Sequence, residues 1–425
     1  MRSLLLCAAT AWAANPLAAQ DTTQVVQEIT GGRSAAAAAL DLPFRVALFP
    51  LRLLAHGLSD GLGWVEGAGV IAMVTTLPDR IRPASIRIGG LGEHSGAGGG
   101  IGVALGQRDV AAYGAGATAN ATTSGYQLHA AEVWYRLGPS LAATVDGQFR
   151  VNTRDEFYGV GNASAPGDRS DYDLRRLAGG VGLEWRPHDR VRVGGRAGWR
   201  RERAGGGGRN PTVANTELVF AASLPPAFDV SYRYLRPSME VAWDGRRATP
   251  RGVLGAWVST LYAYNRVVNA GTSVPDVRFH ELGGEAHAYA SLGGLRRILA
   301  LRTWLEVRRA ERGTIPFHRL AAIGGSRDLR AFPSTRFRDN DGLLLTAEYR
   351  YRVWEDERAA NGLDMVLFVD QGAVAPNLFA GLRANDFHSG YGIGVRLTGK
   401  AVLGRVEVAH GREGTRLLVR AGPPF

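Results

Sequence analysis

The stretch Leu343–Trp354, LLLTAEYRYRVW, alternates between two kinds of side chain. One set is apolar or aromatic and comprises Leu343, Leu345, Ala347, Tyr349, Tyr351 and Val353. The other set is polar and comprises Thr346, Glu348, Arg350 and Arg352. Because successive side chains of a β-strand point to opposite faces, this period of two predicts a strand with one apolar face and one charged face.

The same alternation recurs in Leu141–Asn152, Val191–Arg200 and Leu301–Arg308. Soluble β-sandwiches also alternate, but their strands usually run about five or six residues. Strands that cross an outer membrane are longer, with apolar side chains towards lipid and polar ones towards the lumen. The pattern therefore predicts an all-β fold, an antiparallel transmembrane β-barrel.

About sixteen segments fit this pattern, and an even number is typical of a single-chain bacterial barrel. They are expected near 84–92, 98–106, 109–118, 125–137, 140–151, 170–186, 190–203, 229–244, 252–264, 277–291, 296–308, 342–354, 361–371, 386–398, 400–410 and 413–422. Closing such a sheet into a barrel removes the exposed strand edges that would otherwise promote aggregation. The prediction is a 16-stranded barrel over residues 84–425.

The charge distribution argues against nucleic-acid binding. The 425 residues carry a formal charge of +11, but the basic residues are spread along the strands and form no basic patch. Arginine and acidic residues share the polar face of each strand. We expect them to pair inside the lumen, because an unpaired charge in a confined interior is costly.

The N-terminal residues indicate export. Arg2 precedes a short apolar run from Leu4 to about Ala14, and small residues follow at Ala18 and Ala19, which predicts a signal peptide over 1–19. The one cysteine lies inside it, so a mature chain without disulfides is expected.

Residues 20–83 are predicted to form a periplasmic linker. Within it, 41–58 places Arg45, Arg52 and His56 along one stripe of an amphipathic helix. This helix is expected at the membrane surface or against the barrel mouth, either as a simple tether or as part of a gate.

Three features of the sequence are candidates for chemical sites. The segment His280–His287 contains two histidines and two glutamates that could suggest a metal site, although His280 would face away from the others on a strand. The glycines of 96–102 lack the following helix and the lysine of a phosphate-binding loop. A pair such as Ser389 and His388 has no visible activating group. We therefore expect no catalytic residues, no metal and no cofactor.

The stretch Gly324–Gly342, GGSRDLRAFPSTRFRDNDG, is followed at once by the strand quoted first. Together with nearby motifs it resembles the BamA/TamA superfamily of outer-membrane assembly and translocation barrels, the bacterial surface antigen family. Its tip matches the family's Arg-Gly-aromatic loop motif and consists of Leu329, Arg330, Ala331 and Phe332. The family's Gly-Leu…Glu-Tyr-Arg strand, which directly follows that loop, is matched by Gly342–Leu343 with Glu348–Arg350. Its Phe-x-Asp-x-Gly strand is matched at 368–372. The turn at 243–252, WDGRRATPRG, resembles the family's Asp-x-Arg…Pro-x-x-Gly turn.

The resemblance implies a sixteen-stranded barrel in the bacterial outer membrane whose long extracellular loop folds back into the lumen. From strand parity we expect Arg330 to pair there with Glu348 and Asp370. Ala331 stands where the family usually has glycine, and the terminal aromatic Phe425 matches the residue by which assembly machinery recognises many such barrels. The short segment before the first strand does not predict the periplasmic POTRA domains that handle client chains in the family.

The implied function is non-catalytic insertion of outer-membrane proteins or translocation of a substrate. Expected partners are outer-membrane lipid and lipopolysaccharide, the barrel assembly machinery, and an unidentified client or periplasmic protein. A passive channel or porin for small solutes is the alternative, and a membrane enzyme is the third class.

Overall fold

The structure, a computed structural model, describes residues 84–90, 99–105, 113–121, 126–206, 212–249, 252–268, 274–356, 361–398, 402–420 and 425. The predicted signal peptide, the linker and the helix at 41–58 lie outside these residues. No helix in the described ranges is long and apolar enough to cross a membrane.

One antiparallel sheet dominates the molecule and contains 17 strands among the described residues. These strands are β1 (Ala84–Gly90), β2 (Gly99–Leu105), β3 (Tyr113–Ala121), β4 (Gln127–Arg136), β5 (Leu141–Phe157), β6 (Ser170–His188), β7 (Val191–Gly205), β8 (Ser231–Asp244), β9 (Arg247–Thr249), β10 (Gly252–Val267), β11 (Arg278–Ser291), β12 (Arg297–Arg312), β15 (Asp341–Asp356), β16 (Asn361–Ala375), β17 (His388–Thr398), β18 (Val402–Gly411) and β19 (Gly414–Arg420). The all-β prediction is confirmed.

The remaining elements are short and lie in the connections. They are the two-stranded sheet of β13 (Ala321–Ile323) and β14 (Phe337–Asp339), the helix α6 (Thr216–Val219), and the 3₁₀ turns η2 (Pro166–Asp168), η3 (Phe317–Arg319), η4 (Leu378–Ala380) and η5 (Ala384–Asp386).

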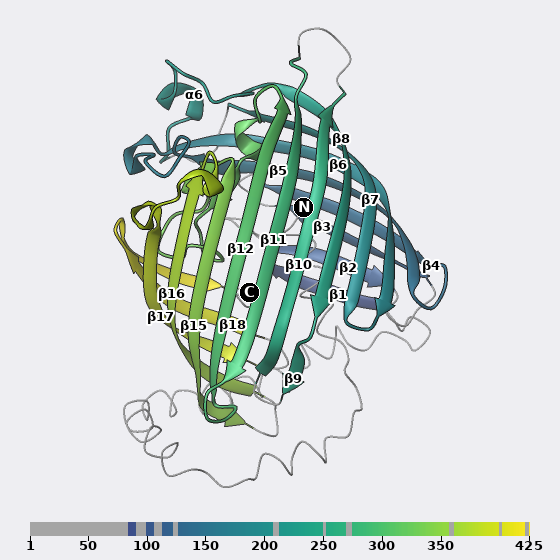
Figure 1. Cartoon of the computed structure of the whole chain (residues 1–425), viewed down its shortest axis with the longest axis vertical. Helices are drawn as coiled ribbons and strands as arrows, with labels where there is room; N and C mark the ends of the chain where they lie inside the picture. The colour runs from purple at the N-terminus through teal and green to yellow at the C-terminus, as the bar shows by residue number, and fades with distance from the viewer. Residues whose placement is uncertain are drawn as a thin grey trace.

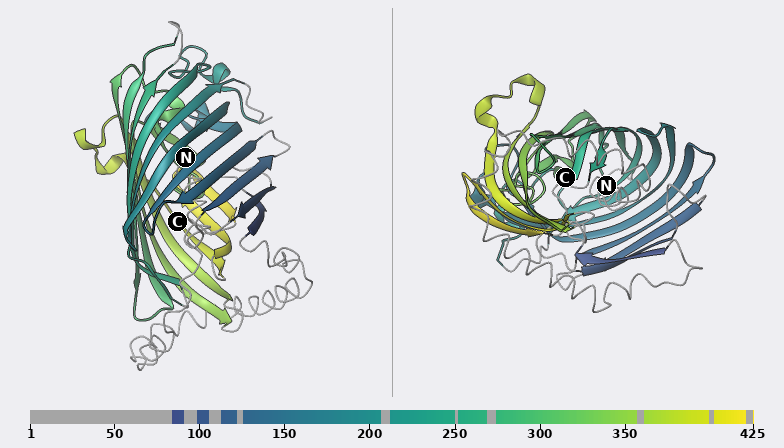
Figure 2. Two further views of the ribbon diagram at one scale, coloured as in Figure 1. Left: turned by 90° about the vertical axis from the view of Figure 1, so that its right-hand side faces the viewer. Right: turned by 90° about the horizontal axis from the view of Figure 1, so that it is seen from below.

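Each long strand pairs with its neighbours in chain order, so the sheet is built from successive hairpins. The ladder from β12 passes directly to β15, and the loop between them leaves the wall of the sheet. The strands run side by side at a tilt (Figure 1). Seen from below, the sheet is strongly curved (Figure 2).

The predicted count of sixteen strands is wrong for this sheet, because β9 adds a further strand. All sixteen predicted segments overlap one of the long strands, and the difference lies in the 243–252 turn. There Gly252, Val253 and Leu254 pair with Thr249, Ala248 and Arg247. A three-residue strand is too short to show a period of two, so its sequence reads as a turn.

Closure of the sheet stays a prediction. The first strand pairs with β2 through register partners from Ala84↔Leu105 to Gly90↔Gly99. The last strand pairs with β18 from Arg405↔Arg420 to Gly411↔Gly414. Within the described ranges no ladder joins β1 to β19.

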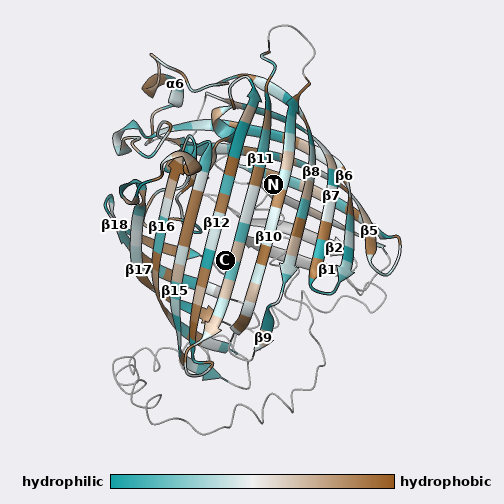
Figure 3. Ribbon diagram, viewed as in Figure 1, coloured by the Kyte–Doolittle hydropathy of each residue, from teal (hydrophilic) through white to brown (hydrophobic). Residues whose placement is uncertain are grey.

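The two faces of the sheet have the predicted polarity. Apolar side chains that point outwards are exposed, as Leu345, Leu367 and Val369 show, whereas Glu348 and Asp370 on the inner face are fully buried. Apolar and polar residues alternate along the strands (Figure 3).

Inner-face arginines pair with acidic residues on nearby strands. Arg196 on β7 contacts Asp146 on β5 at 2.6 Å, and Arg176 on β6 contacts Glu202 on β7 at 2.6 Å. Arginines on the described strands thus form ion pairs on the inner face of the sheet.

Candidate functional site

The connection from β12 to β15 carries the motif that the sequence singled out. Its two arms pair as β13 and β14, and the tip between them turns through Gly324 and Gly325, whose φ angles are 121° and 104°. A Cβ on Gly324 would lie 2.2 Å from the carbonyl oxygen of Pro333, so the close return of the chain requires glycine there.

Arg330 lies at this tip and is 1% exposed. Its Nε and Nη2 donate to the two carboxylate oxygens of Asp370, each at 2.8 Å, and its Nη1 donates to Glu348 at 2.7 Å. The backbone N–H of Arg330 donates to Asp370 as well, at 3.2 Å. The residues paired by sequence parity are thus in direct contact, in the bidentate geometry that guanidinium and carboxylate groups favour.

Glu407 on β18 is a third acidic partner that the sequence reasoning missed. Its Oε1 lies 3.4 Å from Arg330 Nη1 and accepts from Arg396 at 2.7 Å, while its Oε2 accepts from Arg405 at 2.7 Å. Arg396 also binds Glu348 through both of its terminal nitrogens, at 2.9 and 2.7 Å. Alternation within β18 places Glu407 on the inner face, and this was the signal available in the sequence.

Burial of so many charges is tolerable only because they are paired. Burial alone would lower the pKa of the Arg330 guanidinium, but Asp370, Glu348 and Glu407 raise that pKa above its usual range. Removing one partner from such a set leaves a buried charge uncompensated, which typically costs about 3–5 kcal/mol. We call Arg330 with Glu348, Asp370 and Glu407 the arginine lock.

Apolar residues beside Arg330 pack on the same wall. Leu329 and Phe332 are fully buried and form one cluster with Leu344, Val366 and other inner-face residues of β15, β16, β18 and β19. The Arg330 guanidinium carbon lies 3.4 Å from the centre of the Phe368 ring, a cation–π contact. These contacts explain why a charged stretch carries buried apolar residues.

Strand β17 accommodates this packing through glycine at inner-face positions 390, 392 and 394. A Cβ on Gly392 would lie 2.4 Å from the Phe368 ring, and a Cβ on Gly394 would lie 2.5 Å from Glu407 Cγ. A Cβ on Gly390 would lie 2.6 Å from the methyl carbon of Ala331. We call these three glycines the glycine trough.

The trough explains how alanine is tolerated at the loop tip. Gly390 pairs across the ladder with Gly411 of β18. A Cβ on Gly411 would lie 2.8 Å from the Ala331 methyl carbon, so that methyl fits between two residues that lack side chains. The Ala331 departure from the family motif therefore leaves the lock geometrically intact.

Arg336 connects the tip to the other side of the sheet. It is fully buried, contacts Glu413 in the β18–β19 turn at 3.0 Å, and donates to the hydroxyl and carbonyl oxygens of Ser164 at 2.8 and 2.7 Å. Its guanidinium also lies over the ring of Tyr158, at 4.8 Å. The loop thus binds both the C-terminal strands and the β5–β6 connection.

The base of the loop contacts a second charged region. Arg319 donates to Glu281 of β11 at 2.8 Å, and His318 lies 3.4 Å from Glu202 of β7. Burial lowers the pKa of His318, although Glu202 opposes this shift. The loop therefore contacts the inner wall at several separate places.

Two other sequence candidates lie on β11 and β17, within the residues that the structure describes. Glu285 binds His287 at 3.0 Å and Arg302 at 2.7 Å, whereas His280 lies on the outer face. In the part of the chain that the structure describes, no group of three or more His, Cys, Asp or Glu residues could hold a metal ion. Ser389 is exposed and His388 is buried, so they lie on opposite faces of β17.

Phe425 lies against the inner wall of the sheet. It joins a cluster with Tyr289, Ile298 and Ala300, and the Arg350 guanidinium lies 5.1 Å from its ring centre. Its predicted recognition by assembly machinery concerns the unfolded precursor and stays a prediction.

Comparison with solved structures gives two informative neighbours. BamA from Haemophilus ducreyi lacking POTRA domains 1–3 matches with a TM-score of 0.57 at 11% identity, covering 80% of this chain and 70% of that chain. CdiB from Escherichia coli matches with a TM-score of 0.50 at 11% identity, covering 79% of this chain and 61% of that chain. The sequence itself matches no family profile and no curated protein.

At this identity the likeness establishes the fold. It agrees with the sequence motifs of the loop and of β15 and β16, which resemble those of the same group of barrels. The chain therefore has the fold of the bacterial outer-membrane barrels BamA and CdiB.

Proposed function

We propose that this chain is a non-catalytic outer-membrane barrel that inserts outer-membrane proteins or translocates a substrate, and that its lumen loop controls the passage. The observation that carries the proposal is the arginine lock. Four residues from one loop and three wall strands are almost fully buried, paired with one another, and placed where the loop tip meets the inner wall. Such an arrangement holds the loop inside the sheet until several contacts break together.

The seam between the first and last strands is the second part of the proposal. We propose that β1 and β19 meet to close a barrel of sixteen long strands. Strand β1 ends in Gly89 and Gly90, which carry no side chains, so at that end it would offer β19 no cross-strand side-chain pairs to strengthen the seam. A weak seam could open towards the bilayer and receive a client strand.

The partners follow from this role. Outer-membrane lipid, including lipopolysaccharide, would surround the outer face, and a client or a separate periplasmic protein would deliver the substrate. The barrel assembly machinery would act on the precursor.

Conductance in planar bilayers tests the loop. The Arg330→Ala variant should show frequent large openings that the wild type shows rarely, because the loop leaves the inner wall. Arg203→Ala is the control, since Arg203 and its partner Asp229 are each about half exposed (52% and 54%). It should behave as the wild type.

A large, steady conductance that is the same in wild type and Arg330→Ala would contradict the proposal. It would favour the passive channel instead. Normal membrane levels of both variants must be shown first, because loss of the lock also lowers stability.

A further inference from the structure

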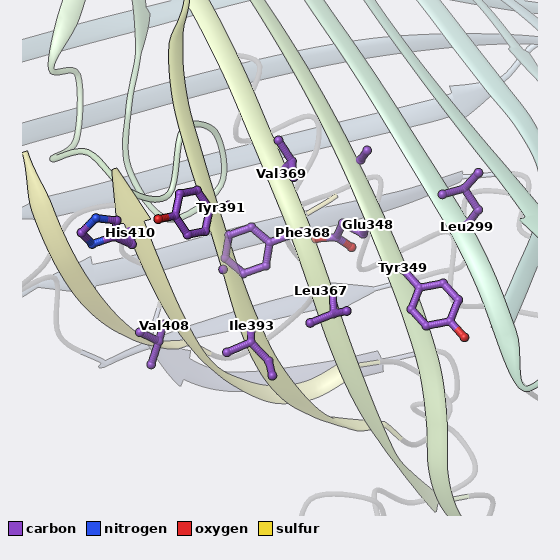
Figure 4. A pocket seen from close by; sticks show the side chains of 12 residues that line it. Leu299, Glu348, Tyr349, Leu367, Phe368, Val369, Tyr391, Ile393, Val408 and His410 are labelled. Carbon is purple, nitrogen blue, oxygen red and sulfur yellow. The ribbon is translucent and has the colours of Figure 1, made fainter. Parts of the chain in front are cut away.

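A groove of about 550 Å³ crosses the outer face of the wall that holds the arginine lock. It runs over β12 and β15–β18 and is almost entirely apolar. Figure 4 shows Leu367, Ile393 and Val408 along one side and Val369 with Tyr391 on the other. Its volume falls within the roughly 300–1,000 Å³ typical of small-molecule sites.

The ladder registers explain the shape of the groove. Tyr349, Leu367, Ile393 and Val408 pair successively across four strands and form one row of outward side chains. Ala347, Val369, Tyr391 and His410 form the next row. The positions between these rows point inwards, and on β17 that position is Gly392, so the space between the rows stays open.

The floor of this groove is shared with the arginine lock. Phe368 lines the groove, yet its ring lies in contact with the Arg330 guanidinium on the inner side, at 3.4 Å. Phe368 is Gly392's partner in the ladder, and it leans over that glycine. Phe368 and the lock residue Glu348 thus belong both to the floor of the groove and to the wall that carries the lock.

The groove also has a polar end. Tyr391 and His410 lie 5.5 Å apart near the end of the wall where β18 turns into β19, and His410 Nδ1 bonds to Thr415 at 2.7 Å. That turn also holds Glu413, which contacts the loop residue Arg336, so it is the end at which the loop enters. Amphipathic aromatic side chains of this kind are typical of the membrane–water interface.

We propose that this groove binds one acyl chain of an outer-leaflet lipid, with the head group at the Tyr391–His410 end. The fold places this wall against hydrocarbon, which selects an apolar ligand. The polar end near the loop selects an amphiphile whose head lies in the outer leaflet. The bound acyl chain would pack against Phe368 from the outer side, while the Arg330 guanidinium contacts the same ring from the inner side.

Native mass spectrometry of the whole protein in mild detergent tests this site, with lipid A as the probe. The Ala347→Phe variant places a large apolar side chain in the groove, from the row that Ala347 shares with Val369 and Tyr391, and keeps the groove apolar. Ala286→Phe on β11 is the matched control, because Ala286 also lies at mid-strand outside the groove. We expect the wild type and Ala286→Phe to retain one lipid A, and Ala347→Phe to lose it.

Three results would overturn the inference. They are retention of lipid A by Ala347→Phe, absence of a one-to-one complex in the folded wild type, and preferential retention of phosphatidylethanolamine, an inner-leaflet lipid. Heat-modifiable migration on gels shows that each variant is folded, so a lost complex cannot be ascribed to misfolding.

Discussion

Replacing Gly390 with alanine should displace the loop tip, and replacing Ala331 with glycine should reverse the effect. The new Cβ at 390 would lie 2.6 Å from the Ala331 methyl carbon, about 1 Å closer than an ordinary contact. Overpacking of this kind typically costs about 1–3 kcal/mol. The next nearest atoms, Ala331 N and Cα, lie at 3.5 and 3.7 Å, so removing the methyl alone restores normal packing.

The double variant gives a quantitative test. Ala331→Gly by itself should cost about 1–2 kcal/mol, from the lost methyl and the added backbone freedom. If the two residues meet as described, the double variant should be less destabilised than the sum of the single changes by about 1–3 kcal/mol. Gly147→Ala is the control, because a Cβ there meets nothing within 4 Å.

The assay is equilibrium unfolding in urea after reconstitution into lipid vesicles, followed by tryptophan fluorescence. Additivity of the two single changes to within about 0.5 kcal/mol would refute the contact. So would a Gly390→Ala variant as stable as Gly147→Ala. Loop-dependent openings in bilayers should follow the same order as the unfolding free energies.

Three further outcomes are expected. Glu407→Gln should lower the free energy of unfolding by about 3–5 kcal/mol, because it leaves Arg396 and Arg405 without their shared carboxylate. The control Asp229→Asn, in an exposed ion pair, should change that free energy by about 0–1 kcal/mol. Equal losses in the two variants would contradict the role of Glu407. His318 has a pKa lowered by burial, so the unfolded chain binds its proton more readily and stability should fall between about pH 7 and 5. His318→Gln should reduce that dependence, and an unchanged pH profile of unfolding would count against it. Phe425→Ala should reduce the amount of folded protein in the outer membrane more than it reduces the yield of refolding in vitro. Heat-modifiable migration on gels measures the folded fraction in both cases. Equal reductions in the two would mean that Phe425 acts only through its packing.

The sequence predicted the strands because each has a polar and an apolar face, and that period survives in the fold. It missed β9, since three residues cannot display a period. It paired Arg330 with Glu348 and Asp370 because strand parity places both carboxylates on the inner face of strands that carry recognisable motifs. Glu407 has no such motif and lies 77 residues from Arg330, so only the folded sheet brings them together.

The glycine trough was missed for a different reason. In sequence, the glycines of HSGYGIGVRLT suggest a weak strand, since glycine offers nothing to pack. The structure shows that Ala331, Phe368 and Glu407 fill the space above them. That complementarity joins three separate parts of the chain, and no local pattern encodes it.

The trough has a mechanical consequence. Between His388 and Arg396, strand β17 has glycine at each of its inward positions, so its inner surface is supplied by other parts of the chain. At one of these positions the filling atom belongs to the loop. In the proposed function, withdrawing the loop would open the passage and would also remove a packing contact from β17. Under that proposal the loop and this wall strand would lose stability together, so a client that displaced the tip would meet a less rigid wall.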